Sequence, residues 1–137
     1  MEKSQVKAVL DTNVLISGIV FSGIPRQVMN LVSQKKVSGV TSPALSTELI
    51  EVLSKKFPFT RGDLELVKKR LKKEYDWVDP SITIGASRDS VDNRVLEAAM
   101  AGRCGYIITG DSHLLDLKAY QNIQILTPAQ FLAKFNV

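Results

Sequence analysis

Two acidic residues stand directly beyond apolar segments of this chain. Asp11 follows the run Val6 to Leu10, and Asp111 follows Tyr106 to Ile108 and the pair Thr109-Gly110. Short, continuous apolar runs that end at polar residues are typical of buried strands. In an open α/β sheet, ligands bind beyond the carboxyl ends of the strands. Both carboxylates are therefore placed for chemistry.

Two further acids share the apolar faces of expected helices. Glu48 comes three residues after Leu45 and four before Val52, and Asp92 lies on a stripe with the i, i+3, i+4 and i+7 spacing. The helix dipole favours negative charge in a first turn, so a capping role for Asp92 or Asp89 is the alternative. Asp89 fits that role better because it precedes the apolar face.

Four carboxylates at one edge of a sheet would repel one another and raise some of their pKa values unless a cation neutralised them. Ligation by oxygen alone suits Mg²⁺ or Mn²⁺. Water bound to such an ion beside a phosphodiester is a reagent for hydrolysis, with one ion or two. The four acids thus predict a divalent metal site.

The elements that must position these acids alternate between strands and helices. This alternation predicts an α/β fold, a single-domain three-layer α/β/α sandwich over residues 1–137 with a mainly parallel central sheet. In such a sheet Asp11 and Asp111 can be neighbours. The segment from Trp77 to Ile84 is expected to be irregular, since Pro80 argues against a central strand. Strands are expected at 6–10, 37–41, 106–108 and 123–126, and helices at 13–21, 25–36, 43–57, 61–73, 91–102 and 128–135.

Composition places the chain among ordinary globular domains, with 45% hydrophobic and 23% charged residues in 137. The single cysteine, Cys104, cannot form an internal disulfide and is expected to be a small buried residue. No window approaches the roughly 20 apolar residues of a membrane-spanning helix. We therefore expect a cytoplasmic protein with no membrane partner.

The net charge of +4 is unevenly distributed, because the segment from Lys55 to Lys73 carries +6 and the remainder −2. A local basic surface attracts polyanions, although a charged helix face is more often simply solvated. Arg26 and Arg88 could likewise either contact phosphates or be solvated surface residues. The candidates for contact with nucleic acid or an acidic partner are Lys68, Lys69, Lys72, Lys73 and Arg94.

Four segments resemble the signature blocks of PIN domains, particularly the VapC-like branch of toxin components from toxin–antitoxin pairs. They are VLDTNVLISG, SPALSTELIEVL, DNRVLEAAMAG and YIITGDSHLL, and the resemblance continues to ILTPAQFL. It implies a Mg²⁺- or Mn²⁺-dependent ribonuclease whose catalytic metal site is formed by Asp11, Glu48, Asp92 and Asp111.

The same resemblance suggests supporting residues and partners. Asn13 matches a polar position that supports the first acid, Thr109 matches a polar residue before the last, and Ser112 or Asp116 could serve as an outer ligand. His113 is interpreted as incidental or as a substrate contact rather than as a general base. The implied partners are an RNA substrate, a small antitoxin protein and a second copy of the chain in a homodimer.

Three other functions were weighed against a nuclease. An aspartate-based phosphatase needs a second Asp two residues after the first, where this chain has Asn13. A phospho-accepting receiver domain needs paired acids after its first strand and a late strand-end Lys, neither of which is convincing here. A PIN module that binds RNA or protein without cutting remains the main alternative.

Overall fold

The structure is a computed structural model that describes residues 6–85 and 90–135. Its elements, in chain order, are β1 (Lys7–Leu10), α1 (Thr12–Val20), α2 (Ile24–Ser33), β2 (Ser38–Thr41), α3 (Pro43–Lys56), α4 (Arg61–Glu74), β3 (Tyr75–Trp77), α5 (Ser90–Ala101), β4 (Tyr106–Ile108), α6 (Ser112–Leu117), β5 (Ala119–Tyr120), β6 (Ile123–Leu126) and α7 (Pro128–Phe135).

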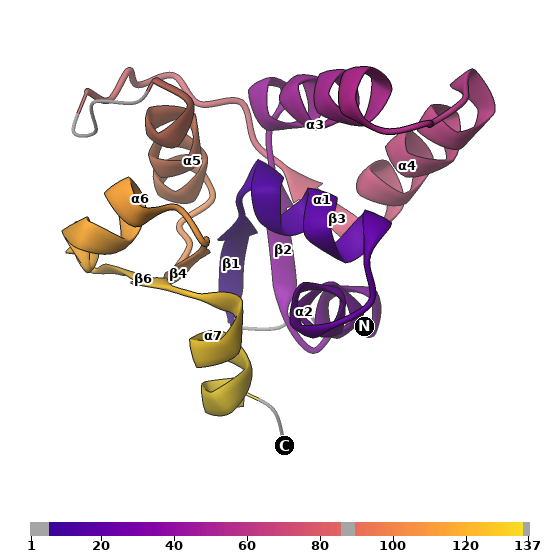
Figure 1. Ribbon diagram of the computed structural model, residues 1–137. Helices are drawn as coiled ribbons and strands as arrows, with labels where there is room; N and C mark the ends of the chain where they lie inside the picture. The colour runs from indigo at the N-terminus through magenta and orange to yellow at the C-terminus, as the bar shows by residue number, and fades with distance from the viewer. Residues whose placement is uncertain (1–5, 86–89, 136–137) are drawn as a thin grey trace.

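The strands form one six-stranded sheet in the order β3-β2-β1-β4-β6-β5. Every neighbouring pair is parallel except β5 with β6. Helices cover both faces of the sheet (Figure 1). The predicted α/β/α architecture with a mainly parallel sheet is confirmed. Because β1 and β4 are adjacent and parallel, their carboxyl ends meet at one edge.

Alternation along β1 divides the core into two parts. Ala8 and Leu10 pack with α1, α2 and α7 on one face of the sheet, while Val9 packs with α5 and α6 on the other. All three side chains are fully buried. The first strand is thus covered on both faces, which explains why its sequence is continuously apolar from Ala8 to Leu10.

Strand β3 was not predicted, since the expected helix ended at Lys73 and the segment from Trp77 was expected to be irregular. The chain instead leaves α4 at Glu74 and adds an edge strand beside β2, with Gly39 opposite Tyr75. The Tyr75 ring occupies the space that a side chain at position 39 would fill. An edge position also tolerates Pro80 shortly afterwards.

Several local signals operate as expected. Thr60 and Asp63 form a reciprocal capping box at the start of α4, as the spacing of a threonine three residues before an acid predicts, and Cys104 is buried as expected. Asp89 and Arg88 lie outside the described residues. In the described part of the chain, no single helix is long and apolar enough to cross a membrane. Only α1 and α2 together reach that length and composition, as a pair bent by 97°.

Candidate acidic metal site

Asp11 stands where β1 ends and α1 begins. Its backbone N–H donates to the carbonyl of Ile108 at 3.1 Å, which extends the pairing of β1 with β4 by one residue. Its carboxylate accepts the N–H of Val14 at 2.8 Å and so caps α1. Only 5% of the residue is exposed. The backbone therefore fixes this carboxylate at the sheet edge.

Thr109 connects the ends of β1 and β4. Its hydroxyl donates a hydrogen bond to Oδ2 of Asp11 and accepts the N–H of Asp111 at 2.9 Å. The residue is completely buried, and its own N–H donates to Leu126 of β6 at 2.9 Å. One side chain thus orients the first acid and the backbone that carries the last.

The environment of Asp11 disfavours its negative charge. Burial raises its pKa from 3.8 to about 6, against the hydrogen bonds from Thr109 and Val14, and the charges of Asp111 and Glu48 raise it further. Glu48 is a half-buried residue of α3 between the buried Leu45 and Leu49. Asp11 is therefore electrostatically coupled to acids from two other elements.

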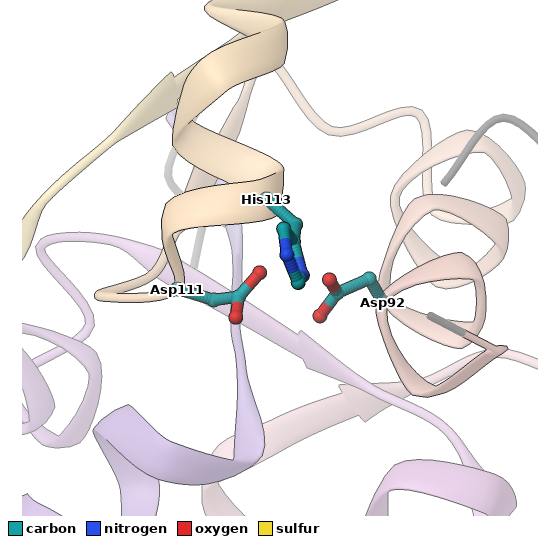
Figure 2. A group of neighbouring side chains, drawn as sticks. All are labelled: Asp92, Asp111 and His113. Atoms are coloured by element: carbon teal, nitrogen blue, oxygen red, sulfur yellow. The ribbon is translucent and has the colours of Figure 1, made fainter. Parts of the chain in front are cut away.

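Asp92, Asp111 and His113 form a compact group beside this carboxylate. Each offers one ligand atom, and these atoms lie within 4.8 Å of one another. Figure 2 shows the two carboxylates facing each other, Asp92 from the first turn of α5 and Asp111 before α6, with the His113 ring beside them. Asp92 is buried, Asp111 partly exposed and His113 exposed.

A hydrogen bond with Asp92 links the two facing carboxyl groups. Burial raises the pKa of Asp111, but the hydrogen bond with Asp92, the Leu114 N–H and the charge of His113 together lower it below its ordinary value. The Leu114 N–H lies 3.0 Å from Asp111 Oδ2 and makes Asp111 the N-cap of α6. The pair is held close in spite of its charge.

The donor set fits a hard divalent cation. Asp11, Glu48, Asp92 and Asp111 come from β1, α3, α5 and the end of β4, and they offer carboxylate oxygens, which Mg²⁺ and Mn²⁺ prefer. A raised pKa at Asp11 and the close approach of the Asp92 and Asp111 carboxyl groups are signs of excess negative charge that a cation would relieve.

The supporting residues expected from the sequence lie in different environments. Thr109 provides the side-chain hydrogen bond to Asp11, whereas Asn13 is exposed on α1. Ser112 and Asp116 are exposed on α6. His113, interpreted from the sequence as incidental or as a substrate contact, lies inside the acidic group. The sequence feature that indicates this position is that His113 follows Asp111, the N-cap of the same helix, by two residues.

Arg94 does not present a free guanidinium to nucleic acid. Its Nη2 donates to Oε2 of Glu97 at 2.8 Å, and its Nε lies 2.8 Å from Oε1. Glu97 is 7% exposed and also accepts the N–H of Ile84 at 2.8 Å. Sequence reasoning missed Glu97, although one acid in the apolar run VLEAAMA, three residues after an arginine, was a usable signal. Lys68, Lys69, Lys72 and Lys73 are exposed on α4 as expected.

The chain is similar to known proteins in sequence or in fold. The chain is 29% identical to the uncharacterized protein MJ1680 of Methanocaldococcus jannaschii, covering 98% of this chain and 95% of that one. Its fold is similar to VapBC2 of Rickettsia felis bound to a DNA fragment from their promoter, with a TM-score of 0.56, 15% identity, and 88% and 97% of the two chains covered. FitAcB of Neisseria gonorrhoeae is similar with a TM-score of 0.55, 14% identity, and 89% and 98% covered. Residues 7–113 match the PIN domain family, and the chain belongs to that family.

Proposed function

We propose that this PIN domain is a Mg²⁺- or Mn²⁺-dependent ribonuclease that hydrolyses phosphodiester bonds in single-stranded or looped RNA. The observation that supports this most is the side-chain link through Thr109, which holds Asp11 and Asp111 together at the ends of adjacent strands. Members of the PIN family are typically nucleases, and acidic side chains that can hold a divalent metal ion are what such chemistry requires.

In this proposal Asp11, Glu48, Asp92 and Asp111 hold the metal. A bound ion would acidify and orient the attacking water and offset the negative charge of the phosphate. Asp92 and Asp111 must both be ionised to act as ligands. His113 is exposed beside them, where it would contact the substrate.

The direct test is cleavage of an RNA panel by the purified chain with Mn²⁺, with Mg²⁺ and with EDTA. We expect cleavage with either metal and none with EDTA. Asp11→Asn and Asp92→Asn should each lower kcat/KM by a factor of at least about 100. Asp63→Asn, at the exposed start of α4, should stay within about twofold. RNAs that remain intact with Mn²⁺ and wild-type protein would favour the non-cleaving binding module.

We further propose that the chain is the toxin of a toxin–antitoxin pair and forms a homodimer. This rests on the resemblance of its motifs to VapC-like proteins and on the similarity of its fold to VapBC2 and FitAcB. A small neighbouring gene for a DNA-binding protein that binds this chain and relieves growth arrest would support the pairing. Light scattering that gives a monomer mass at micromolar concentration would exclude the homodimer.

A further inference from the structure

A groove runs between α3 and α4 beside the carboxyl end of β3. Its first part, about 300 Å³, is lined by Ser46, Thr47, Ile50, Glu51, Lys68, Lys72 and Trp77. A second part of about 510 Å³ shares Lys68 and adds residues that include Phe59 and Arg61. The two helices lie side by side at this end of the molecule (Figure 1).

We propose that this groove binds single-stranded RNA on its way to the acidic site, with Lys68 and Lys72 contacting phosphates and Trp77 stacking on a base. The inference rests on the nuclease function proposed above and specifies where the substrate lies. A basic channel with an aromatic platform is the usual composition of a surface for single-stranded nucleic acid.

The groove lies at the same sheet edge as the acids. Trp77 ends β3, which pairs with β2, and β2 pairs with β1, which ends before Asp11. All these strands are parallel, so their carboxyl ends are aligned, and two strand spacings amount to about 10 Å. A few nucleotides span that distance. Helix α3 borders both regions, because Glu48 belongs to the acidic site while Thr47 and Glu51 line the groove.

Trp77 is held in a position that suits stacking. Its Nε1–H donates to the carbonyl of Leu71 at 3.0 Å, which restrains the indole, yet 38% of the residue is exposed. An indole whose polar atom is already paired offers its face rather than its edge to a ligand.

The charge of the lining favours a polyanion and Trp77 favours one that carries bases, so the test compares RNA with an acidic protein segment. The lining contains Arg61, Lys68 and Lys72 against Glu51 and Glu65. Lys68 pairs with Glu65 at 3.3 Å, but both side chains are exposed, and such pairs contribute little. Lys68 can therefore exchange this partner for a phosphate at small cost.

Trp77 is the one tryptophan of the chain, so its fluorescence reports occupancy of the groove. The experiment titrates oligouridylate into the full-length Asp92→Asn variant in EDTA, where no cleavage is needed. We expect quenching that weakens with salt. Lys68→Ala/Lys72→Ala should lower the affinity about tenfold and reduce the slope of log affinity against log salt by about 1.4.

The matched control is Lys69→Ala/Lys73→Ala, which removes the same charge from the same helix outside the groove lining. Its affinity should fall by less than about threefold. With labelled RNA and anisotropy, Trp77→Phe should retain binding and Trp77→Leu should lose about tenfold. Equal losses of RNA affinity in the two double-lysine variants, or an affinity that does not depend on Trp77, would contradict RNA binding in the groove.

Two outcomes separate this inference from the nuclease proposal. RNA that binds in the groove but is never cut by the wild type with Mn²⁺ would contradict the nuclease proposal and support the groove as an RNA-binding site. Normal cleavage with an unchanged KM in Lys68→Ala/Lys72→Ala would contradict RNA binding in the groove and support the nuclease proposal. Quenching by poly-glutamate with the same lysine dependence, and none by RNA, would assign the groove to an acidic protein segment and overturn the RNA path.

Discussion

The hydroxyl of Thr109 donates a hydrogen bond to the carboxylate of Asp11, although the two residues are 98 positions apart in the chain. The same oxygen accepts the N–H of Asp111. Since Thr109 is fully buried, water cannot substitute for it. The orientation of the first acid and the position of the last therefore depend on one side chain that is itself no metal ligand in our proposal.

Replacement of Thr109 by Val keeps the shape of the side chain and removes both hydrogen bonds. We expect the affinity for Mn²⁺ and the value of kcat to fall by about 10- to 100-fold each, as is usual for residues that orient metal ligands. Thr109→Ser retains the hydroxyl and should stay within about threefold of wild type. Calorimetric titration with Mn²⁺ measures the affinity without requiring turnover. Equal losses in the two variants would show that packing, not hydrogen bonding, matters at this position.

Asp11 gives the metal-free protein a defined pH dependence. Its pKa is about 6 in the folded state and 3.8 ordinarily, so the folded state binds more protons between these values. The free energy of unfolding should therefore fall as the pH rises from about 4 through about 6, by about 3 kcal/mol from this residue. The stabilising contribution is complete below the unfolded pKa and lost above the folded one.

Urea unfolding in EDTA across this pH range measures the effect, with Asp11→Asn as the reference. The variant should lack this part of the decline, so its stability relative to wild type should increase as the pH rises. Mn²⁺ should stabilise the wild type more at pH values above about 6 than below, because protonated carboxyls do not bind metal. Parallel pH profiles for the two proteins would contradict the burial argument.

The convergence of Asp11 and Asp111 could be predicted because two simple signals combine. Each acid follows a short apolar run, and parallel strands align their carboxyl ends. No local feature of the sequence indicated the order of the strands, so it could not be predicted that β4 lies directly beside β1. Thr109 could be named as a polar residue before an acid, but its partner 98 residues away became visible only with the strand order.

The two differences from expectation have different causes, one a contact between distant residues and one a local ion pair. β3 forms because the Tyr75 ring fits over Gly39, and Arg94 is engaged because Glu97 is buried beside it. Helix periodicity assigns a residue to a face but does not identify its neighbours across the core. Arg94 was a candidate for contact with nucleic acid, and the structure pairs it with Glu97 one turn along the same helix, where the spacing of three residues is a local signal.

Glu97 should stabilise the segment that precedes α5. It is buried, accepts the N–H of Ile84 and pairs with Arg94. Glu97→Ala leaves both donors without this partner and should lower the free energy of unfolding by about 3 kcal/mol. Glu97→Gln keeps an acceptor for Ile84 and should cost about 1 kcal/mol. Hydrogen exchange at the Ile84 amide should accelerate in the Ala variant far more than in the Gln variant, and equal rates would rule out the proposed contact.

Gly39 provides a test of how β3 is attached to the sheet. A Cβ at this position would lie 2.7 Å from two atoms of the Tyr75 ring and 2.9 Å from Val32 Cγ1. Gly39→Ala should therefore lower the free energy of unfolding by about 2 kcal/mol, and adding Tyr75→Leu should recover part of that loss by removing the ring. The control is Gly62→Ala in the first turn of α4, where a Cβ would meet only Thr60 Oγ1 at 3.7 Å. That variant should be neutral or gain up to about 1 kcal/mol. Urea unfolding of the four proteins decides the matter, because equal effects at the two glycines would mean that the packing of Tyr75 on β2 does not hold the edge strand in place.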